Sequence, residues 1–483
     1  MNFVQEIFDI KNAILSNNIA VRSSSGQISY VELASRLDKA AAHLKNLGIR
    51  RNEYAAVLSN NSPEFITLIF SLWKLCAIPV ILNSRLLEGE IHTLLSLTGS
   101  KRLFISEGLA YKFNSDIIQK IIFPFNKFAA EDNTDFKINL DSTAVVIFTS
   151  GSTGMPKGVE ITFNNLLQSA LTGNQYFKHR KNDRWLASLP FYHIGGFSII
   201  IRSFLFGATL LFPEDLGIKS LSESFSNMHP THASLVSTQI KRFVESGVKP
   251  NKELREVLLG GGFIDSSLII SAIKKGWNVA RSFGASETSS FISVLTAEQF
   301  LNKKDSAGKA LSPNEILIVD ESKNILPPYE IGEIAIKAKS VAKGYLNDPD
   351  ATNKKFDNGF YYTGDFGYVD ADGYMFVEAR RNDLIVTGGE NVNPIEVEKA
   401  VMKHPLIIEA SVFGFMDKEW GQIVAAALVT KDNIELSLDD LKSFLSESLA
   451  SFKHPKKIFI VKSLPRTELG KIQKEKLKEM LSK

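Results

Sequence analysis

The first three hundred residues alternate between helical periodicity and short apolar runs. Residues 29–48 (SYVELASRLDKAAAHLKNLG) place apolar side chains at helical spacing, whereas the runs at 54–59 and 78–83 are typical of buried strands. Six further runs end at Gly, Pro or Ser: TAVVIFTS, RWLASLP, ATLLFP, HASLVS, LREVLLGGG and WNVARSFG. This alternation predicts an α/β layered architecture, in which ligands bind at the ends of the strands.

After residue 313 the pattern changes. Apolar runs at 314–320, 332–338 and 373–379 are separated by turn-rich text such as NDPD and DADG, which predicts antiparallel strands and hairpins. The segment 379–394 (ARRNDLIVTGGENVNP) breaks this regularity with charges, two glycines and a proline, and we expect a hinge there. Strand and helix patterns resume after it, as in a small α+β domain.

These patterns predict an α/β fold divided into two domains. A chain of 483 residues exceeds the size at which one hydrophobic core usually stops growing. We expect a large N-terminal domain at 1–380, built of layered α/β subdomains plus a β-barrel-like subdomain. A small mobile α+β C-terminal domain is expected at 381–483.

Composition and charge exclude several classes of protein. The 56 basic and 53 acidic residues are interspersed, so charge gives no case for a nucleic-acid partner. Cys76 is the single cysteine, which excludes an internal disulfide and a cysteine-based zinc cluster. Charges such as Lys74 and Arg202 interrupt the longest apolar runs, so we expect no membrane span. The N-terminal text lacks the order of a signal peptide, and we expect a soluble cytoplasmic protein.

The loop FTSGSTGMPKGV at 148–159 is the strongest local signal for chemistry. Backbone N–H groups of a Gly-rich turn converge on one point, and a helix expected from about Phe163 follows closely, which suits phosphate oxygens. The potential donors are Thr149, Ser150, Ser152, Thr153 and Lys157. It is not a Walker A loop, because Pro156 replaces the required glycine and Gly158 follows the lysine. The alternative is a flexible loop without a ligand.

This loop is the first of five motifs that resemble those of the adenylate-forming superfamily, which contains acyl-CoA synthetases, nonribosomal peptide adenylation domains and firefly-type luciferases. The other four follow in the same order: SFGASET at 282–288, YYTGDFGYVDADGY at 361–374, ARRNDLIVTGGENVNPIEVE at 379–398 and PRTELGKIQK at 465–474. The resemblance covers the chain from about residue 29 to the C-terminus.

The resemblance implies a two-step reaction with ATP, Mg²⁺ and coenzyme A. A carboxylate attacks the α-phosphate of ATP to give an acyl-adenylate and pyrophosphate, and a thiol then displaces AMP. The implied ATP- and AMP-binding residues are Thr149, Ser150, Gly151, Ser152, Thr153, Gly154, Lys157, Gly261, Gly262, Ser282, Phe283, Gly284, Ser286, Asp365 and Arg380. Phe283 replaces the family's usual Tyr, and Ser286 its usual Thr.

The same resemblance implies the catalytic residues Lys471, Glu287, Ser286 and His193. Glu287 would be the magnesium ligand, since Mg²⁺ takes few carboxylates beside phosphate oxygens. Lys471 would bridge the attacking carboxylate and the α-phosphate, while Lys157 escorts pyrophosphate. The small domain would then rotate about a hinge at Asn382, and Gly388 and Gly389 would let the pantetheine arm of CoA pass.

For the acid pocket, the resemblance implies His193, Gly195, Arg202 and Gly260. In these segments the sequence is most similar to the o-succinylbenzoate-CoA ligases of menaquinone synthesis, whose substrate carries two carboxylates. Arg202, alone in an apolar run, is a candidate partner for the second carboxylate. It could equally be snorkelling, or paired at the surface.

Three functions stay open at this point. The first is an acid-CoA ligase acting on o-succinylbenzoate or on another aromatic or fatty acid. The second is a stand-alone adenylation enzyme that loads a carrier-protein thiol. The third, an inactive binding module, is disfavoured because Glu287, Asp365, Arg380 and Lys471 are all present. The expected partners are a small carboxylic acid, ATP and CoA; a homodimer stays open.

Overall fold

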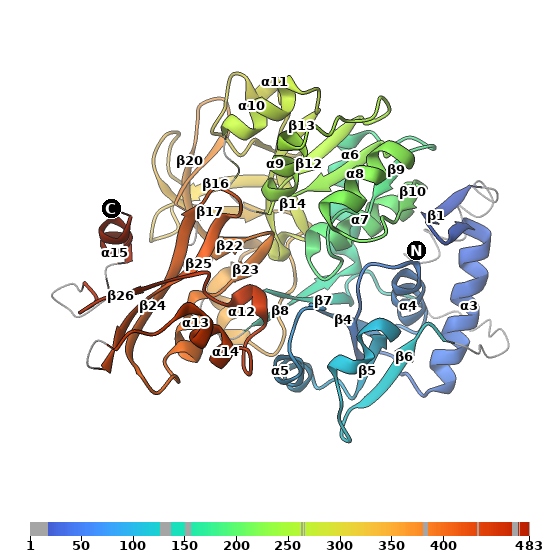
Figure 1. The fold of residues 1–483 in the computed structure, drawn as a ribbon. Helices are drawn as coiled ribbons and strands as arrows, with labels where there is room; N and C mark the ends of the chain where they lie inside the picture. The colour runs from blue at the N-terminus through green and yellow to red at the C-terminus, as the bar shows by residue number, and fades with distance from the viewer. Residues whose placement is uncertain are drawn as a thin grey trace. The chain divides into compact units, whose positions relative to one another are not determined.

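Two large sheets carry most of the first 310 residues (Figure 1). The computed structural model describes residues 18–125, 137–149, 156–261, 264, 266–379, 385–431, 434–465, 472 and 474–482. A seven-stranded sheet has the order β18-β8-β7-β4-β3-β5-β6, and its pairs β3–β4, β3–β5, β4–β7 and β5–β6 are parallel. The runs at 54–59 and 78–83 are buried strands of this sheet, as the sequence predicts.

The strands of this sheet are β3 (Tyr54–Leu58), β4 (Ile78–Leu82), β5 (Arg102–Ser106), β6 (Gln119–Phe123), β7 (Thr143–Thr149), β8 (Lys157–Thr162) and β18 (Gly344–Tyr345). The helices of this part of the chain are α3 (Tyr30–Asn46), α4 (Pro63–Lys74) and α5 (Glu88–Thr98), with a 3₁₀ turn at Glu107–Lys112. α3 spans most of the segment that has helical periodicity in the sequence, and the hydroxyl of Ser29 caps its N-terminus.

The second sheet has nine strands in the order β15-β14-β13-β12-β11-β9-β10-β1-β2. They are β1 (Ile19–Ser23), β2 (Gly26–Ser29), β9 (Arg184–Leu186), β10 (Thr209–Leu211), β11 (His232–Leu235), β12 (Glu256–Leu259), β13 (Val279–Ala285), β14 (Ser290–Leu295) and β15 (Lys309–Ala310). Its helices are α6 (Phe163–Phe177), α7 (Ile194–Leu205), α8 (Ile218–Asn227), α9 (Ser237–Glu245), α10 (Ser266–Lys274) and α11 (Ala297–Phe300). The central pairs from β1–β10 to β12–β13 are parallel.

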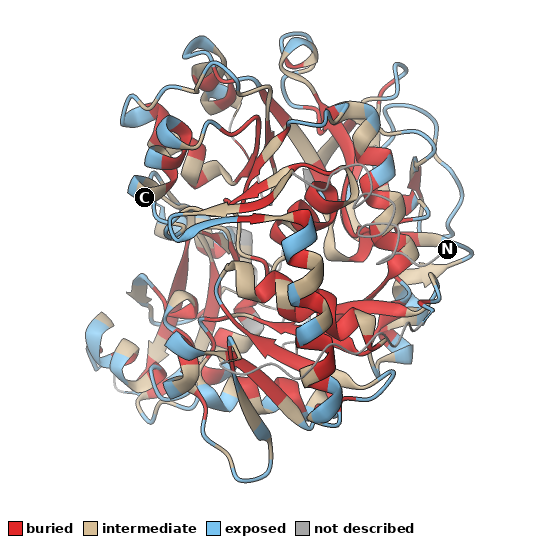
Figure 2. Ribbon diagram, turned by 90° about the vertical axis from the view of Figure 1, so that its right-hand side faces the viewer, coloured by how far each residue is buried: buried red, intermediate tan, exposed pale blue. Residues whose placement is uncertain are grey.

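The hydrophobic core joins side chains from both sheets and from the helices that cover them. Trp73 is fully buried, its ring meets Phe70, Phe163 and Phe197 edge-on, and its indole N–H donates to the carbonyl of Ala144 at 2.7 Å. Burial is concentrated on the strands and on the inward faces of the helices (Figure 2). Helix α7 belongs to this interior, because nearly all of its side chains are buried.

A third, antiparallel sheet follows, as the change of pattern after residue 313 predicts. Its path is β16-β17-β20-β19, with β21 paired to β20. The elements are β16 (Glu315–Val319), β17 (Gly332–Lys337), α12 (Pro349–Lys355), β19 (Phe356–Asp357), β20 (Phe360–Val369) and β21 (Met375–Ala379). The α/β class with an antiparallel portion is therefore confirmed.

The C-terminal residues form a small α+β fold, also as predicted. Its elements are β22 (Ile385–Thr387), β23 (Glu390–Val392), α13 (Pro394–Val401), β24 (Ile407–Asp417), β25 (Gly421–Thr430), α14 (Leu438–Leu445), a 3₁₀ turn (Ser451–Lys453), β26 (Lys457–Ile460) and α15 (Lys474–Leu481). The sheet order is β23-β22-β25-β24, and β26 pairs in parallel with β25.

The chain forms two compact units. One contains residues 1–84, 95–148 and 158–380, and the other contains 85–94, 149–157 and 381–483. The division of roles between a domain at 1–380 and a domain at 381–483 stays a prediction. Among the helices of the described residues, none is long and apolar enough to cross a membrane.

Candidate active site

The phosphate loop expected from the sequence is flanked by two strands. Thr149 ends β7 and Lys157 begins β8. Helix α6 starts at Phe163, where the sequence predicts it, and Thr162 and Asn165 form a reciprocal capping box at its N-terminus. The expected residues that lie outside the described ones are Ser150, Gly151, Ser152, Thr153, Gly154, Gly262, Arg380, Asn382 and Lys471.

The motif at 282–288 forms a strand followed by a tight turn. Ser282, Phe283 and Gly284 lie in β13, and a single 3₁₀ turn (Ser286–Thr288) then leads into β14. The Ser282 hydroxyl donates to the carbonyl of Leu259 at 3.0 Å, which ties β13 to the end of β12. The expected residues Gly260 and Gly261 follow that end of β12 directly.

Glu287 lies in this turn and is only 4% exposed. The hydroxyl of Tyr345 donates to its Oε1 at 2.8 Å. Among the described residues, no lysine, arginine or histidine forms an ion pair with Glu287. No cation of the described residues therefore occupies this carboxyl group, which suits a ligand of Mg²⁺, an ion that takes its remaining ligands from phosphate oxygens and water.

The predicted residues His193 and Gly195 lie at the start of α7. His193 is the N-cap residue of that helix, and its ring meets the ring of Tyr192 edge-on at 4.8 Å. Gly196 packs so closely that an added Cβ would lie 2.1 Å from the carbonyl oxygen of Pro190. A glycine is therefore required where α7 leaves the segment after β9.

Arg202 lies near the other end of α7 and is 1% exposed. Its guanidinium carbon is 4.9 Å from the ring centre of Trp185, 5.5 Å from that of Phe291 and 5.6 Å from that of Phe177. These three rings, named here the aromatic cage, give the cation a favourable π environment. Burial lowers the pKa of Arg202 to about 9, so the side chain stays charged at neutral pH.

The charge of Arg202 has no partner among the described residues. Its Nε and Nη1 are buried and make no hydrogen bond, and no carboxylate forms an ion pair with it. The two alternatives left open by the sequence, snorkelling to the surface and pairing at the surface, are therefore wrong. A buried cation without a counter-ion costs several kcal/mol, so Arg202 stays the candidate partner for the second carboxylate of the acid.

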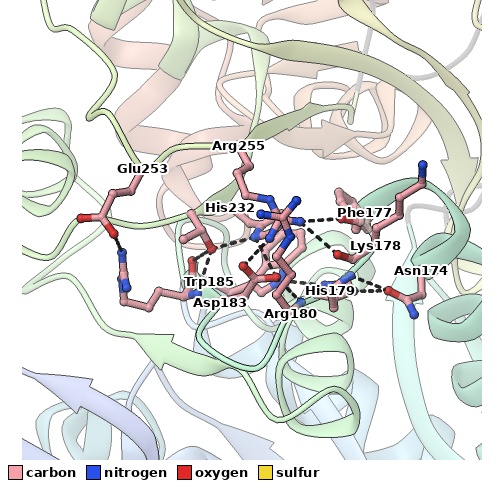
Figure 3. Close-up of polar contacts among 12 residues, drawn as sticks. Asn174, Phe177, Lys178, His179, Arg180, Asp183, Trp185, His232, Glu253 and Arg255 are labelled. Atoms are coloured by element: carbon pink, nitrogen blue, oxygen red, sulfur yellow. Dashed lines mark hydrogen bonds and ion pairs between the residues drawn. The ribbon is translucent and has the colours of Figure 1, made fainter.

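Hydrogen bonds hold the cage ring Trp185 through His179, and they also hold the neighbouring ring of His232 (Figure 3). The backbone N–H of His179 donates to Oδ1 of Asn174, and so this oxygen must also accept from His179 Nδ1 at 2.7 Å. The other ring nitrogen, Nε2, then accepts the indole N–H of Trp185 at 2.9 Å. His179 thus fixes the position of Trp185 as a neutral ring.

His232 is fully buried, and its ring stacks on Trp185 at 4.9 Å. The hydroxyl of Thr231 donates to the carbonyl of Arg184, so His232 Nδ1 donates to that hydroxyl at 2.8 Å. Burial first, and then nearby positive groups that include Arg202, lower the pKa of His232 far below its usual range. The ring stays neutral, with its Nε2 buried and unpaired among the described residues.

An ion pair fixes the segment that carries two of these rings (Figure 3). Arg255 Nη1 lies 2.6 Å from Oδ1 of the buried Asp183, and its Nη2 donates to the carbonyl of Phe177 at 2.8 Å. Asp183 also accepts the backbone N–H of Arg180 at 2.7 Å. The connection between α6 and β9 is therefore held in one conformation, with Phe177 and Trp185 facing Arg202.

One hydroxyl contact joins helix α7 to strand β14, which follows the turn that carries Glu287. The hydroxyls of Ser198 on α7 and Ser290 on β14 are 3.2 Å apart. Ser290 begins β14 three residues after Glu287, and the next residue, Phe291, belongs to the aromatic cage. The strand that follows the expected metal ligand therefore contacts the helix that carries Arg202.

Asp365 lies on β20, in the antiparallel sheet. Its backbone N–H donates to the hydroxyl of Thr363 at 3.0 Å. The same sheet meets β13 through a hydrophobic cluster that includes Phe283 and Tyr361. Phe283 is therefore largely buried among aliphatic and aromatic side chains, and its proposed contact with adenine would use the small part of the ring that is accessible.

Gly388 and Gly389 form the two-residue turn between β22 and β23. Both have positive φ values, 57° and 84°, which a two-residue hairpin of this kind requires. An added Cβ on Gly388 would lie 2.7 Å from the indole of Trp420, and Nζ of Lys456 is 3.5 Å from the ring centre of Trp420. Gly388 thus packs against Trp420, and the ring of Trp420 in turn lies against the cation of Lys456.

Sequence reasoning missed several residues of these clusters. Tyr345, His232 and Trp420 lie outside the five motifs that carry the resemblance, and the three cage rings are typical of ordinary core residues by sequence. Their positions depend on contacts between strands far apart in the chain, for which one sequence carries no signal. Among the described residues, no group of three or more His, Cys, Asp or Glu side chains could hold a metal ion.

Comparisons with known proteins find two matching family models and relatives that cover nearly the whole chain. The family model "AMP-binding enzyme" matches residues 10–346, and "AMP-binding enzyme C-terminal domain" matches residues 396–471. The chain is 35% identical over 469 residues to a 2-succinylbenzoate--CoA ligase of Geobacillus sp. (strain WCH70), with 96% of this chain and 94% of that protein covered.

Two solved structures of o-succinylbenzoate CoA synthetase from Bacillus subtilis are also similar. A double mutant bound with the product analogue OSB-NCoA has a TM-score of 0.89 at 32% identity and covers 99% of this chain and 98% of that one. A complex with ATP and magnesium ion has a TM-score of 0.76 at 32% identity and covers 99% of both chains.

The contact of Gly196 predicts a large effect of one methyl group. Gly196→Ala should lower the free energy of unfolding by about 1–3 kcal/mol or more, because the methyl group meets backbone that cannot yield. Urea unfolding measures the difference. Gly195→Ala is the matched control, since its Cβ would lie 3.4 Å from Leu189; equal losses in both variants would contradict the packing described here.

Glu256, at the start of β12, predicts a dependence of stability on pH. Burial raises its pKa from 4.5 to about 7. The folded state then favours the protonated form, so this contribution to stability is fully present below pH 4.5 and is lost as the pH rises through 7. Glu256→Gln should therefore stabilise the protein at pH 8 and much less at pH 5, as measured by urea unfolding. Glu253→Gln, whose carboxylate accepts from Arg184, should gain nothing at pH 8.

Proposed function

Because the chain belongs to the AMP-binding enzyme family, we propose that it is an AMP-forming acid-CoA ligase that acts on 2-succinylbenzoate in menaquinone biosynthesis. A carboxylate of the acid attacks the α-phosphate of ATP to give an acyl-adenylate and pyrophosphate. The thiol of CoA then attacks the acyl carbon, forms the thioester and releases AMP.

The buried guanidinium of Arg202 is the observation that supports 2-succinylbenzoate as the acid. It lies in the aromatic cage without a carboxylate partner among the described residues, so a ligand carboxylate would complete it. 2-Succinylbenzoate provides an aromatic ring and a second carboxylate beside the one that reacts. The rings of the cage suit the aromatic part, and a fatty acid would leave the cation unpaired.

The nucleotide would be held by residues of the N-terminal part. The proposed contacts are Thr149, Ser150, Gly151, Ser152, Thr153, Gly154 and Lys157 for the phosphates, Ser282, Phe283, Gly284, Gly261 and Gly262 for the adenine, and Asp365 and Arg380 for the ribose. Glu287 would hold Mg²⁺, which neutralises phosphate charge when bound. The hydroxyl of Ser286 would donate to the α-phosphate.

The C-terminal part would supply both the second cation and the CoA surface. Lys471 would stabilise the charge that develops between the carboxylate and the α-phosphate. Rotation about Asn382 would then exchange it for the surface of Gly388, Gly389, Trp420 and Lys456. Trp420 offers an apolar plane to pantetheine, and Lys456 offers a charge to a CoA phosphate.

We place this enzyme in the cytoplasm, where ATP and CoA are available. No nucleic-acid partner is proposed, in keeping with the balanced charge. A homodimer, which the sequence leaves open, stays a prediction.

The function is tested by acid-dependent exchange of pyrophosphate into ATP, followed by detection of acyl-CoA. 2-Succinylbenzoate should support both reactions. Exchange without acyl-CoA would contradict a CoA ligase and favour an enzyme that loads a carrier-protein thiol. Exchange with other acids and none with 2-succinylbenzoate would contradict the proposed acid.

Lys471→Ala separates the two half-reactions. This variant should lose adenylation by a factor of roughly a hundred or more, because a charge that stabilises only that transition state is removed. Thioester formation from supplied acyl-adenylate and CoA should continue at close to the original rate. Single-turnover kinetics of each half-reaction measure both effects, and equal loss of the two would contradict the rotation.

Arg202→Met tests the anion site. The KM for 2-succinylbenzoate should rise about 10- to 100-fold, the value of a charge-assisted hydrogen bond. 4-Oxo-4-phenylbutanoate, which lacks the ring carboxylate, is the matched control substrate and should react equally with both proteins. The variant should unfold at the same or a higher urea concentration, since an unpaired buried charge is removed. An equal change with both acids would contradict the role of Arg202.

A further inference from the structure

We propose that Tyr345 is a positioning residue that holds Glu287 ready to bind the metal ion of the nucleotide. This inference rests on the proposed function, since it takes Glu287 as the magnesium ligand. The sequence gives no sign of it, because Tyr345 stands 58 residues after Glu287 and outside the motifs that carry the resemblance.

The contact itself is short and buried. The hydroxyl of Tyr345 lies 2.8 Å from Oε1 of Glu287, and Tyr345 is 5% exposed. Among the described residues, this is the one hydrogen bond that reaches the Glu287 carboxylate. Oε2 accepts no hydrogen bond from them and is not among the fully buried unpaired atoms. One oxygen is thus fixed by the phenol, and the other accepts no hydrogen bond from the described residues.

The chemistry of the partner matters. A lysine or arginine at this place would neutralise the carboxylate and compete with a metal ion. A phenol is neutral, so it compensates part of the cost of burial, fixes the rotamer and leaves the negative charge in place. Tyr345 is therefore suited to orient Glu287 for a metal ion. A cationic partner would instead occupy the carboxylate in place of the metal ion.

The strand that carries Tyr345 also leads to the phosphate loop. Tyr345 pairs with Val159 and Gly344 with Glu160, so β18 lies beside β8, and β8 begins at the last residue of the loop. The backbone N–H of Leu346 donates to the carbonyl of Gly158 at 2.7 Å. A displacement of β8 would therefore be passed to Glu287 through the backbone of β18 and the Tyr345 ring.

The rest of this segment is clamped to the Glu287 turn. The backbone N–H of Ala342 donates to the carbonyl of Glu287 at 2.7 Å, and the hydroxyl of Ser289 donates to the carbonyl of Ser340 at 2.8 Å. Asn165 of α6 donates to the carbonyls of Lys339 and Val341. The phenol is thus aimed by a rigid frame, which is what positioning a carboxylate requires.

Tyr345→Phe tests the inference, because it removes the hydroxyl and keeps the ring. The readout is calorimetric binding of ATP with Mg²⁺ and of ATP in EDTA, without any acid. The affinity for Mg²⁺-ATP should fall about tenfold, while the affinity for metal-free ATP should not change. Electron paramagnetic resonance of Mn²⁺ added with ATP gives the same comparison without activity.

Tyr30→Phe is the matched control. Tyr30 is fully buried, and its hydroxyl donates to the carbonyl of Ala208 at 2.7 Å, far along the chain from Glu287. This variant should lose similar stability and keep the ratio of the two ATP affinities. If both variants change the ratio alike, or if Tyr345→Phe weakens ATP equally with and without Mg²⁺, Tyr345 is a structural residue only and the inference is wrong.

A double-mutant cycle with Glu287→Gln separates the two steps of the argument. In that background Tyr345→Phe should cause no further loss of affinity for Mg²⁺-ATP, and an additive loss would contradict action through Glu287. The proposed function fails separately, by absence of acid-dependent pyrophosphate exchange in the unchanged protein. The metal-dependent binding of ATP is measured without acid and so decides the role of Tyr345 in either case.

Discussion

The cost of burying a charge is the constraint on which this site depends. A carboxylate, Glu287, and a guanidinium, Arg202, are both almost completely buried, and the described residues neutralise neither. In each case neutral groups provide partial compensation: a phenol for Glu287 and three aromatic rings for Arg202. Burying each charge costs free energy, and binding of a ligand of opposite charge would offset that cost.

One strand connects these two charges. β14 starts three residues after Glu287, and its second residue, Phe291, is one wall of the aromatic cage. The Ser198–Ser290 contact joins it to the helix that carries Arg202. A cation bound at Glu287 and an anion bound at Arg202 would therefore be held in a fixed position relative to each other. An enzyme that joins a nucleotide to a two-carboxylate acid needs that fixed position, because the reacting groups must meet in one geometry.

The groups around the site contribute rigidity. The Asp183–Arg255 pair fixes the turn that carries Phe177 and Trp185, and His179 fixes Trp185 through a defined tautomer. His232 is kept neutral, which avoids a second positive charge beside Arg202. In the C-terminal unit the Gly388–Gly389 turn is also tightly packed. Both glycines have positive φ values, and the indole of Trp420 lies against the backbone of Gly388.

The sequence by itself determined the class of fold, the change to antiparallel strands after residue 313, the start of α6 and the family resemblance. These properties depend on local periodicity, turn residues and short motifs, which are readable along the chain. It also singled out Glu287, Arg202 and His193. It left open whether Arg202 is paired at the surface or buried, and it gave no sign of Tyr345, of His232 or of the cage.

Only the tertiary structure decided those points, because burial and pairing are properties of distant contacts. Arg202 lies among Phe177, Trp185 and Phe291, which come from three different elements. Tyr345 meets Glu287 because β18 pairs with β8, a register that no local pattern contains. The sequence supplies the charged groups, and the fold decides which of them are buried and which of them have a counter-ion among the described residues.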